Sequence, residues 1–563
     1  MKKIFIIILI AAAFSCNKSY LDVSPKGQLS QAQVAAGTEQ LVTAAYSSLG
    51  NDHYYTPWSL WNYGSVRSGD AYKGGRDESD IQEFYFGEIF VNQRSDLGNL
   101  DGQWFQYYVA ISRVNAALSN LNSVSETTYP LKKVRQAEMR FLRGHWYFQL
   151  KILFKNIPYI DETVNTNDYA KISNRALSND SLWEKIAGDF QFAVNNLPVS
   201  QPQIGRPNNI AANAYLAKTR LYQAYEQDEK HNVTGINATK LNQVVSLCDQ
   251  VLNSSYGLEP DFANNFLLGS AYENGRESIF AVQYSKDDGT MFGRLDFGDV
   301  LATPMGIGCC DFHKPSQNLA NAFKTDANGL PMFNNFNASD LDLTANTVDP
   351  RIDHTIAIPG HNWKYNQNEL YQNSWNRTPD VYGYFASLKE NVQRNSYIQV
   401  GPFYGSPKNR ILIRYADVLL WKAEALIELN RANEAVSLIN QVRTRAQNST
   451  SLLKFSNGSP ESNYNIGIYQ PGINCNWTQD FARQALRWER RLEFAMEGNR
   501  FFDLVRWGIA DTYLNSYFQV EKTKRKYLKD GLFTKNRDEY LPIPLNQIKF
   551  SHGLYVQNPG YTN

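Results

Sequence analysis

The sequence predicts a mostly α-helical protein, a superhelix of tetratricopeptide-like helix pairs with long loops and a few short β-strands. Three observations predict this fold. Apolar residues recur at spacings of three and four over many segments, which is the pattern of helices with one buried face. Ala423 and Ala435 lie twelve residues apart in two consecutive helical patterns, the spacing at which paired repeat helices cross closely. Between residues 256 and 410 the helical pattern gives way to glycine, proline, asparagine and aromatic residues.

The expected elements can be placed along the chain. We expect helices at residues 33–49, 102–121, 180–197, 208–225 and 241–252, and another that opens near Pro130. Residues 50–102 lack a helical period and are too long for a plain connection, which indicates a functional or partly stranded segment. An apolar run at residues 278–284 predicts a strand. The two helices at residues 413–446 form the clearest repeat unit, and such pairs must stack to bury their apolar faces.

The C-terminal part predicts a helix, a stop and a second short helix. Apolar residues spaced three and four apart run through residues 481–496, and Thr478 is placed as the N-cap. Gly498 is placed to end this helix, because a left-handed conformation costs glycine little. Residues 501–507 are strongly apolar and form the short second helix.

The same C-terminal stretch is rich in glutamate and arginine. Arg490 with Glu493, and Glu497 with Arg500, are opposite charges three residues apart that would pair along a helix. We interpret these charges as a packing and ion-pairing device and not as a ligand site, because such faces are usually solvated or paired.

Composition limits the function classes. The chain of 563 residues is long enough for one large domain, and its 43% hydrophobic content supports a sizeable core. The formal net charge is +1 and no basic run occurs, so nucleic acid is not an expected partner. The 34 tyrosines and 11 tryptophans are numerous enough for some rings to serve recognition.

The N-terminus has the features of an export segment. Lys2 and Lys3 precede an apolar run at residues 4–14, which is shorter than the roughly 20 residues that span a bilayer. The run ends in small residues before Cys16, a loose form of a bacterial lipobox. We predict a signal peptide at residues 1–15 and acylation of Cys16, for example with palmitate, which would anchor the chain in a membrane. An ordinary secretory peptide with an incidental cysteine is the alternative.

Several segments resemble one bacterial family. The string ERRLEFAMEGNRFFDLVRWG at residues 489–508 resembles the signature of the RagB/SusD family, the outer-membrane nutrient-binding lipoproteins of Bacteroidetes. The positions that fit the signature are Glu489, Arg490, Arg491, Glu493, Phe494, Glu497, Gly498, Arg500, Phe501, Asp503, Leu504, Arg506 and Trp507. Residues 138–159, 413–430, 349–351 and 541–544 resemble further family segments. The resemblance thus extends over the whole chain after the export segment.

This resemblance implies a fold and a function. It implies a single SusD-like domain at residues 16–563, with helical parts at 16–255 and 411–563 around a loop-rich insert at 256–410. The expected function is to capture an oligosaccharide or polysaccharide at the cell surface and deliver it to a SusC-like TonB-dependent transporter. The expected location is the outer membrane, through the lipid anchor. The alternatives are the same uptake role for peptides, or a repeat scaffold that binds proteins.

The resemblance also implies that the protein is not an enzyme. The motifs HExxH, G-x-S-x-G, the P-loop and a GxGxxG entering a helix do not occur in the sequence. Cys309, Cys310, Asp311 and His313 are compact but lack the paired spacing of zinc sites. We therefore expect no metal and no cofactor. Carboxylate pairs are numerous and their separations are not given by sequence, so a lipid-anchored hydrolase remains an alternative.

Two loop stretches are the candidate ligand sites. Sugars present apolar C–H faces and rings of hydroxyls, so a binder needs exposed aromatic rings with polar groups around them. Residues 70–76 and 361–384 carry that mixture. The candidate ligand-binding residues are Tyr72, Lys73, Arg76, Trp363, Tyr371 and Trp375. Each ring has the alternative of packing inside its own loop.

The remaining cysteines, histidines and tryptophans are expected to be structural. Four cysteines other than Cys16 do not make a disulfide framework, and a bond between the neighbours Cys309 and Cys310 would be strained. His354 and His361 are expected to be solvated or structural. The two tryptophans at positions 58 and 61 lie three apart, which favours core packing over ligand contact.

Overall fold

The structure is a computed structural model and describes residues 37–286, 288–289 and 295–562. The predicted signal peptide, Cys16 and the start of the first expected helix lie outside these residues. The longer helices are α3 (Thr38–Ser47), α4 (Gln82–Ile89), α5 (Gly98–Ser123), α6 (Lys132–Phe154), α7 (Asn179–Asn196), α8 (Asn209–Ala224), α9 (Ala238–Leu252), α13 (Tyr415–Glu428), α14 (Ala432–Gln447), α15 (Gln479–Glu493) and α17 (Ala510–Lys524). Short helices are α10 (Gln317–Ala322), α11 (Arg351–Thr355), α12 (Pro379–Tyr382), α16 (Arg500–Arg506) and α18 (Leu545–Phe550).

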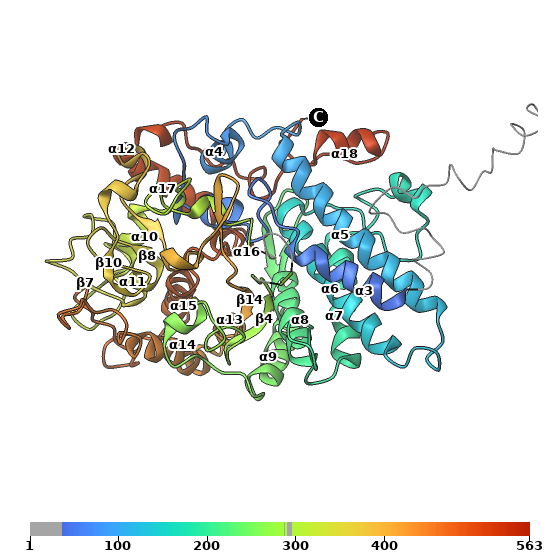
Figure 1. The fold of residues 1–563 in the computed structure, drawn as a ribbon, viewed down its shortest axis with the longest axis horizontal. Helices are drawn as coiled ribbons and strands as arrows, with labels where there is room; N and C mark the ends of the chain where they lie inside the picture. The colour runs from blue at the N-terminus through green and yellow to red at the C-terminus, as the bar shows by residue number, and fades with distance from the viewer. Residues whose placement is uncertain (1–36, 287, 290–294, 563) are drawn as a thin grey trace, which may run out of the picture.

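The helical superhelix is confirmed. Helices α5 to α9 pack each against the next, and they occupy one side of the molecule (Figure 1). Helix α13 packs against α8, α9 and α14, so the pair α13–α14 continues the stack although the insert separates it from α9 in sequence. Ala423 and Ala435 are fully buried in the core between α13 and α14. Small side chains at these positions permit the close helix crossing that the sequence predicted.

Local sequence signals start several of these helices. The side chains of Ser178, Asn208 and Asn237 accept hydrogen bonds from backbone N–H groups at the starts of α7, α8 and α9. Thr478 does the same for α15, as predicted. The expected elements at residues 180–197, 208–225, 241–252 and 278–284 match observed elements to within a few residues.

The strands are short and pair only in twos. They are β1 (Ala71–Gly74), β2 (Tyr225–Gln227), β3 (Val233–Ile236), β4 (Ser278–Val282), β5 (Phe312–Pro315), β6 (Lys324–Thr325), β7 (Thr347–Val348), β8 (Ile356–Ala357), β9 (Asn362–Trp363), β10 (Asn366–Leu370), β11 (Ala386–Ser387), β12 (Ile398–Val400), β13 (Phe403–Gly405) and β14 (Arg410–Arg414). The antiparallel pairs are β1–β5, β2–β3, β4–β14, β6–β7, β8–β11, β9–β10 and β12–β13. Strand β1 lies inside the stretch 50–102, which is therefore partly stranded.

Buried ion pairs join the insert to the C-terminal helices. Glu493, at the end of α15, contacts three fully buried arginines: Arg351 at 3.0 Å, Arg414 at 2.8 Å, and Arg445. Glu277, just before β4, binds both Arg414 and Arg445 at 2.7 Å. We call these five residues the central charge network. Burial alone would raise the pKa of the Glu493 carboxyl, but the charges of the three arginines outweigh it and hold that pKa well below its usual range.

The charge pairs expected within the C-terminal stretch are wrong. Arg490 pairs with Asp503 at 2.8 Å, and Glu493 belongs to the central charge network. Glu497 pairs with Arg414 and with Lys389 at 2.7 Å, not with Arg500. Because these side chains are buried, each one binds the opposite charge that the tertiary fold brings to it.

Gly498 also has a different role from the predicted one. Helix α15 ends at Glu493, five residues earlier. Gly498 does have a left-handed backbone, with φ of +75°, but its carbonyl lies against Gly64 in the short helix Asn62–Val66. A Cβ atom at residue 64 would stand 1.7 Å from the Gly498 oxygen, so this approach requires glycine at residue 64.

No helix within the described residues is long and apolar enough to cross a membrane.

Removing the carboxylate of Glu493 should strongly destabilise the fold. Glu493→Ala would leave three buried guanidinium groups without their shared partner, and breaking a buried ion pair costs about 3–5 kcal/mol. Denaturant unfolding monitored by circular dichroism measures this loss. Glu434→Ala on α14, whose side chain is 55% exposed, is the control and should change stability by no more than about 0.5 kcal/mol. Equal stability of the two variants would contradict the central role of the network.

Candidate ligand-binding site

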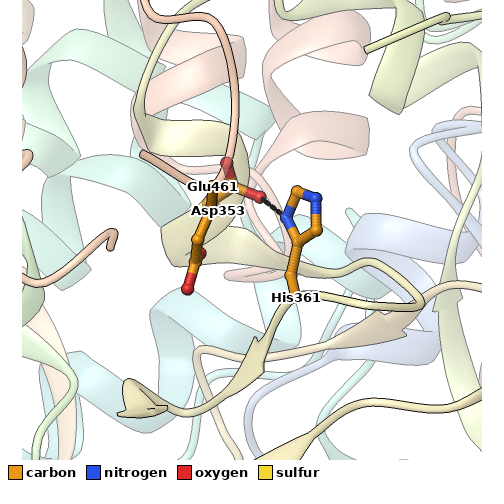
Figure 2. Close-up of side chains that lie close together, drawn as sticks. All are labelled: Asp353, His361 and Glu461. Atoms are coloured by element: carbon orange, nitrogen blue, oxygen red, sulfur yellow. Dashed lines mark hydrogen bonds and ion pairs between the residues drawn. The ribbon is translucent and has the colours of Figure 1, made fainter. Parts of the chain in front are cut away.

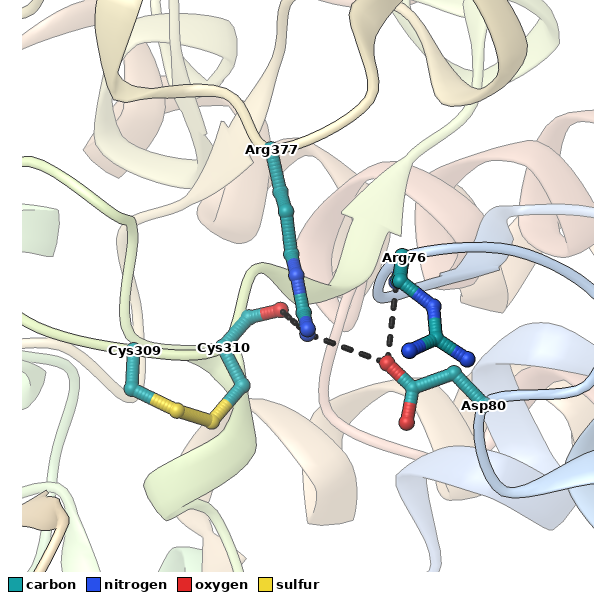
Figure 3. The surroundings of a disulfide bond; sticks show 5 residues. All are labelled: Arg76, Asp80, Cys309, Cys310 and Arg377. Carbon is teal, nitrogen blue, oxygen red and sulfur yellow. Dashed lines mark hydrogen bonds and ion pairs between the residues drawn. A yellow bond between two sulfur atoms is a disulfide. The ribbon is translucent and has the colours of Figure 1, made fainter.

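The two loop stretches singled out in the sequence meet in space. The Thr378 hydroxyl donates a 2.8 Å hydrogen bond to the carbonyl of Arg76. The Asp80 carboxylate accepts from the Arg76 backbone at 2.9 Å and from the Arg377 guanidinium at 3.0 Å (Figure 3). We call Arg76, Asp80, Arg377 and Thr378 the loop junction. It lies next to the starts of α4 and α12, which occupy the same end of the molecule (Figure 1).

A third loop completes the junction and carries a disulfide. Cys309 and Cys310 are bonded to each other, and the carbonyl of Cys310 faces Arg377 at 3.4 Å (Figure 3). The sequence indicated that a bond between these neighbours would be strained, and the structure nevertheless forms it. The backbone N–H of Arg377 donates to Asp311 at 2.7 Å, so the loop is fixed on both sides of the junction.

The four residues at positions 309–313 do not gather around one point. Asp311 pairs with Lys314 at 2.7 Å, and His313 pairs with Glu390 at 2.8 Å. Asp311 and His313 thus face different partners.

Most candidate ligand residues from the sequence are buried. Trp363, Tyr371 and Trp375 pack on one another with ring centroids 5.5–5.9 Å apart, and they form the core of their own loop region. The Trp363 indole donates to the carbonyl of Val392 at 3.1 Å. In this structure these rings present no face to a ligand, so their placement corrects the prediction in favour of the loop-core alternative.

Tyr72 and Lys73 are likewise internal. The Tyr72 hydroxyl donates to Glu521 at 3.0 Å. The Lys73 ammonium donates to the carbonyls of Asp77 and Asp80 at 2.8 and 2.6 Å. Burial lowers the pKa of Lys73 to about 8, although the neighbouring acids oppose the shift. Both residues therefore shape the loop, and of the six candidates only Arg76 is well exposed, with 64% of its side chain accessible.

A group of partly exposed rings lies beside the loop junction. His53, Tyr54, Tyr55, Phe297 and Phe403 form this aromatic patch. Tyr54 is its centre, with ring centroids 4.3 Å from Tyr55 and 4.9 Å from Phe403. Tyr55 is 41% exposed, and Tyr54, Phe297 and Phe403 are half-buried on the rim of a hydrophobic core that also includes Cys309.

Buried polar groups position the turn that carries three of these rings. One oxygen of the Asp52 carboxylate accepts from the backbone N–H groups of His53 at 3.0 Å and Trp58 at 2.8 Å. The other oxygen pairs with Arg410, the first residue of β14. Burial raises the pKa of Asp52 to about 7 despite Arg410, and nearby Asp296 adds to the shift.

The hairpin β12–β13 connects the patch to the loop junction. Successive strand residues point to opposite faces, so Phe403 contacts Tyr54 while Tyr404 turns the other way. A Cβ atom at Gly308 would stand 2.0 Å from the Tyr404 ring, which shows how closely this ring covers the loop that leads into Cys309. The hairpin thereby contacts both the patch and the loop that leads to the disulfide.

Sequence reasoning missed the aromatic patch. Its rings come from three segments far apart in the chain, and single aromatic residues in loops give no periodic signal. The only available hint was the aromatic-rich, non-helical stretch at residues 50–102, which contains three of the five rings. Trp58 and Trp61 from the same stretch are buried, as expected.

The fold places the protein in a class of helical-repeat proteins in which a loop-rich insert packs against the helical stack. The model of the SusD family matches residues 276–561, and a model described as starch-binding associating with outer membrane matches residues 19–221. The chain therefore belongs to the SusD family.

Similar proteins support this assignment. The SusD-like protein P2 of Formosa agariphila is 26% identical over 576 aligned residues, which cover 99% of each chain. A solved SusD superfamily protein from Bacteroides vulgatus matches with a TM-score of 0.68 at 21% identity, over 94% of this chain and 99% of that one. Surface glycan-binding protein A from Bacteroides thetaiotaomicron, solved in complex with laminarihexaose, matches with a TM-score of 0.62 at 19% identity, over 93% and 99% of the two chains.

The different burial of the two ring groups predicts different costs of truncation. Trp363→Ala should destabilise the protein by about 3–5 kcal/mol, because it removes a fully buried indole from the loop core. Tyr55→Ala should change stability by no more than about 0.5 kcal/mol, because the side chain is largely at the surface. Chemical denaturation compares the two variants. A small loss for Trp363→Ala would return that ring to the list of ligand contacts.

Proposed function

We propose that the protein captures an oligosaccharide or polysaccharide at the cell surface and binds it without turnover. The observation that carries the proposal is the aromatic patch beside the loop junction. Rings with partly exposed faces can stack on the apolar C–H faces of sugars, and such contacts gain apolar burial without requiring charge. The exposed Tyr55 ring, next to Tyr54, is the first contact that we assign to the ligand.

The polar groups for this binding come from the loop junction. Asp80 holds Arg377, and 30% of the Arg377 side chain is accessible. Arg76 forms a surface pair with Asp77, in which both side chains are widely exposed. Guanidinium and carboxylate groups can donate to and accept from sugar hydroxyls, and their mutual bonds hold them in place before the ligand arrives.

The relatives support a carbohydrate as the ligand. One matching family model is described as starch-binding, one solved relative is titled a laminarin-binding SusD-like protein, and another was solved with laminarihexaose. These descriptions belong to those proteins. They favour glycans over peptides for this chain because its loops also carry partly exposed rings and hydrogen-bonding groups.

The partner that we propose is a SusC-like TonB-dependent transporter of the outer membrane. Family membership supports this partner, and the description of the second family model supports association with the outer membrane. The chain would be held there through acyl chains on Cys16 and would face the cell surface. In this arrangement the protein hands its glycan to the transporter without changing it.

Loss of a patch ring should weaken glycan binding. We expect Tyr55→Ala and Phe403→Ala each to lower the affinity for the bound polysaccharide about tenfold, equivalent to ~1.4 kcal/mol. Affinity electrophoresis against a glycan panel identifies the ligand, and calorimetry measures the loss. Phe550→Ala is the control, because Phe550 is 50% exposed and lies on α18, outside the patch and both candidate loop stretches. Binding to peptides only, or equal affinities in all variants, would contradict the proposed site.

Removal of the acylated cysteine should release the protein from the membrane. Cys16→Ser leaves no thiol for acylation, so we expect the variant to lose its place in the outer-membrane fraction. Cell fractionation with immunoblotting measures the distribution. Cys475→Ser, which changes a half-buried free cysteine, is the control and should leave the wild-type distribution unchanged. Retention of Cys16→Ser in the membrane would overturn the anchor.

A further inference from the structure

Three metal-ligating side chains from distant segments meet inside the insert. Asp353 lies on α11, His361 precedes β9, and Glu461 belongs to the connection between α14 and α15. One possible ligand atom from each residue lies within 4.8 Å of the other two, and all three residues are buried (Figure 2). The cluster is separate from both the aromatic patch and the loop junction.

Asp353 is oriented by hydrogen bonds on both oxygens. One oxygen accepts from Nδ1 of His361 at 2.8 Å, and the His361 ring turns toward it (Figure 2). The other accepts from the hydroxyls of Ser462 at 2.6 Å and Tyr464 at 2.7 Å. Hydroxyl donors behind a carboxylate are the kind of outer contacts that orient metal ligands.

Among the residues that the structure describes, Glu461 has no comparable partner. Its closest donor is the backbone N–H of Asn362, at a long 3.4 Å. The Asn362 side chain lies against the same carboxyl, and its buried Oδ1 has no hydrogen-bond partner among the described residues. Within the described part of the chain, no lysine or arginine forms an ion pair with either Asp353 or Glu461. The cluster thus holds two buried carboxylates with a single imidazole, and the neighbouring Asn362 Oδ1 is unpaired, which is a surplus of acceptors.

We propose that Asp353, His361 and Glu461 bind one divalent transition-metal ion of the zinc class. An imidazole nitrogen and carboxylate oxygens are ligands that zinc accepts, and three protein ligands leave the fourth position for water. Calcium fits less well, because it prefers oxygen ligands alone. The cation would coordinate the acceptor oxygens that lack a close donor among the described residues.

Binding would also balance charge and join loops. The His361 Nδ1 proton would leave to solvent, and the ion would then neutralise the two carboxylates. The three ligands would tie α11 and the β9–β10 hairpin to the segment that contains Glu461. Since β9 holds Trp363, a ring of the buried loop core, the ion would stabilise the framework of the insert. This role is structural and does not depend on the nature of the proposed glycan.

Zinc titration of the chelator-treated full chain tests the proposal. We expect one zinc ion per chain by calorimetry and elemental analysis after dialysis, and a thermal midpoint that rises with added zinc chloride. Glu461→Gln keeps the size of the side chain but removes a direct ligand. It should lower the zinc affinity by more than the roughly 10–100-fold that loss of an outer contact causes. Ser462→Ala should lose about 10–100-fold, because Ser462 acts only through Asp353.

The controls separate this site from incidental zinc binding. His552→Asn changes an exposed histidine far along the chain and should bind zinc as the wild type does. His361→Asn should abolish binding. If that variant does not fold, Glu461→Gln decides the matter. Absence of zinc binding to the wild type, or equal affinity in the wild type and Glu461→Gln, would overturn the proposal. Glycan affinity is a separate measurement, so failure of either proposal can be recognised independently.

Discussion

The buried ion pairs around Glu493 are the constraint on which the arrangement of the chain depends. A carboxylate that is fully removed from water must be paired, and here a single one contacts arginines from α11, β14 and α14. Those arginines in turn require Glu277 and their other acidic partners. The helical stack and the insert are thereby joined by a network in which each buried charge is neutralised by the opposite charges of the others.

This dependence explains why the glutamate- and arginine-rich signature lies at the structural centre. Glu489 contacts Arg351 at 2.6 Å and Arg443 at 3.0 Å, and Arg506 contacts Glu424. Three of the segments that resemble the family supply many of these charges: residues 349–351 contain Arg351, residues 413–430 contain Arg414 and Glu424, and residues 489–508 contain the signature itself. Their role is to hold the architecture, whereas the ligand contacts that we propose come from loops, which can vary on the same frame.

The sequence could predict the helices but not the partners of buried side chains. Periodicity and caps place α7, α8, α9 and α15 within a few residues, because these signals are local. Arg490 pairs with Asp503 and not with Glu493 because of how the helices fold back on one another. Spacing along the sequence cannot predict such a tertiary contact. Likewise Trp363 and Tyr55 are both aromatic residues in loops, and only the tertiary fold makes the first a core residue and the second a surface ring.

The same network also bears on the candidate binding face, through strand β14. Arg414, at one end of this strand, belongs to the central charge network, and Arg410, at the other end, pairs with Asp52. Asp52 fixes the turn that presents Tyr54 and Tyr55. A five-residue strand paired with β4 therefore links the buried charge network to the partly exposed rings of the aromatic patch. Rings held in this way would lose little conformational entropy on binding the proposed ligand, so the stability of the core would contribute to the affinity at the surface.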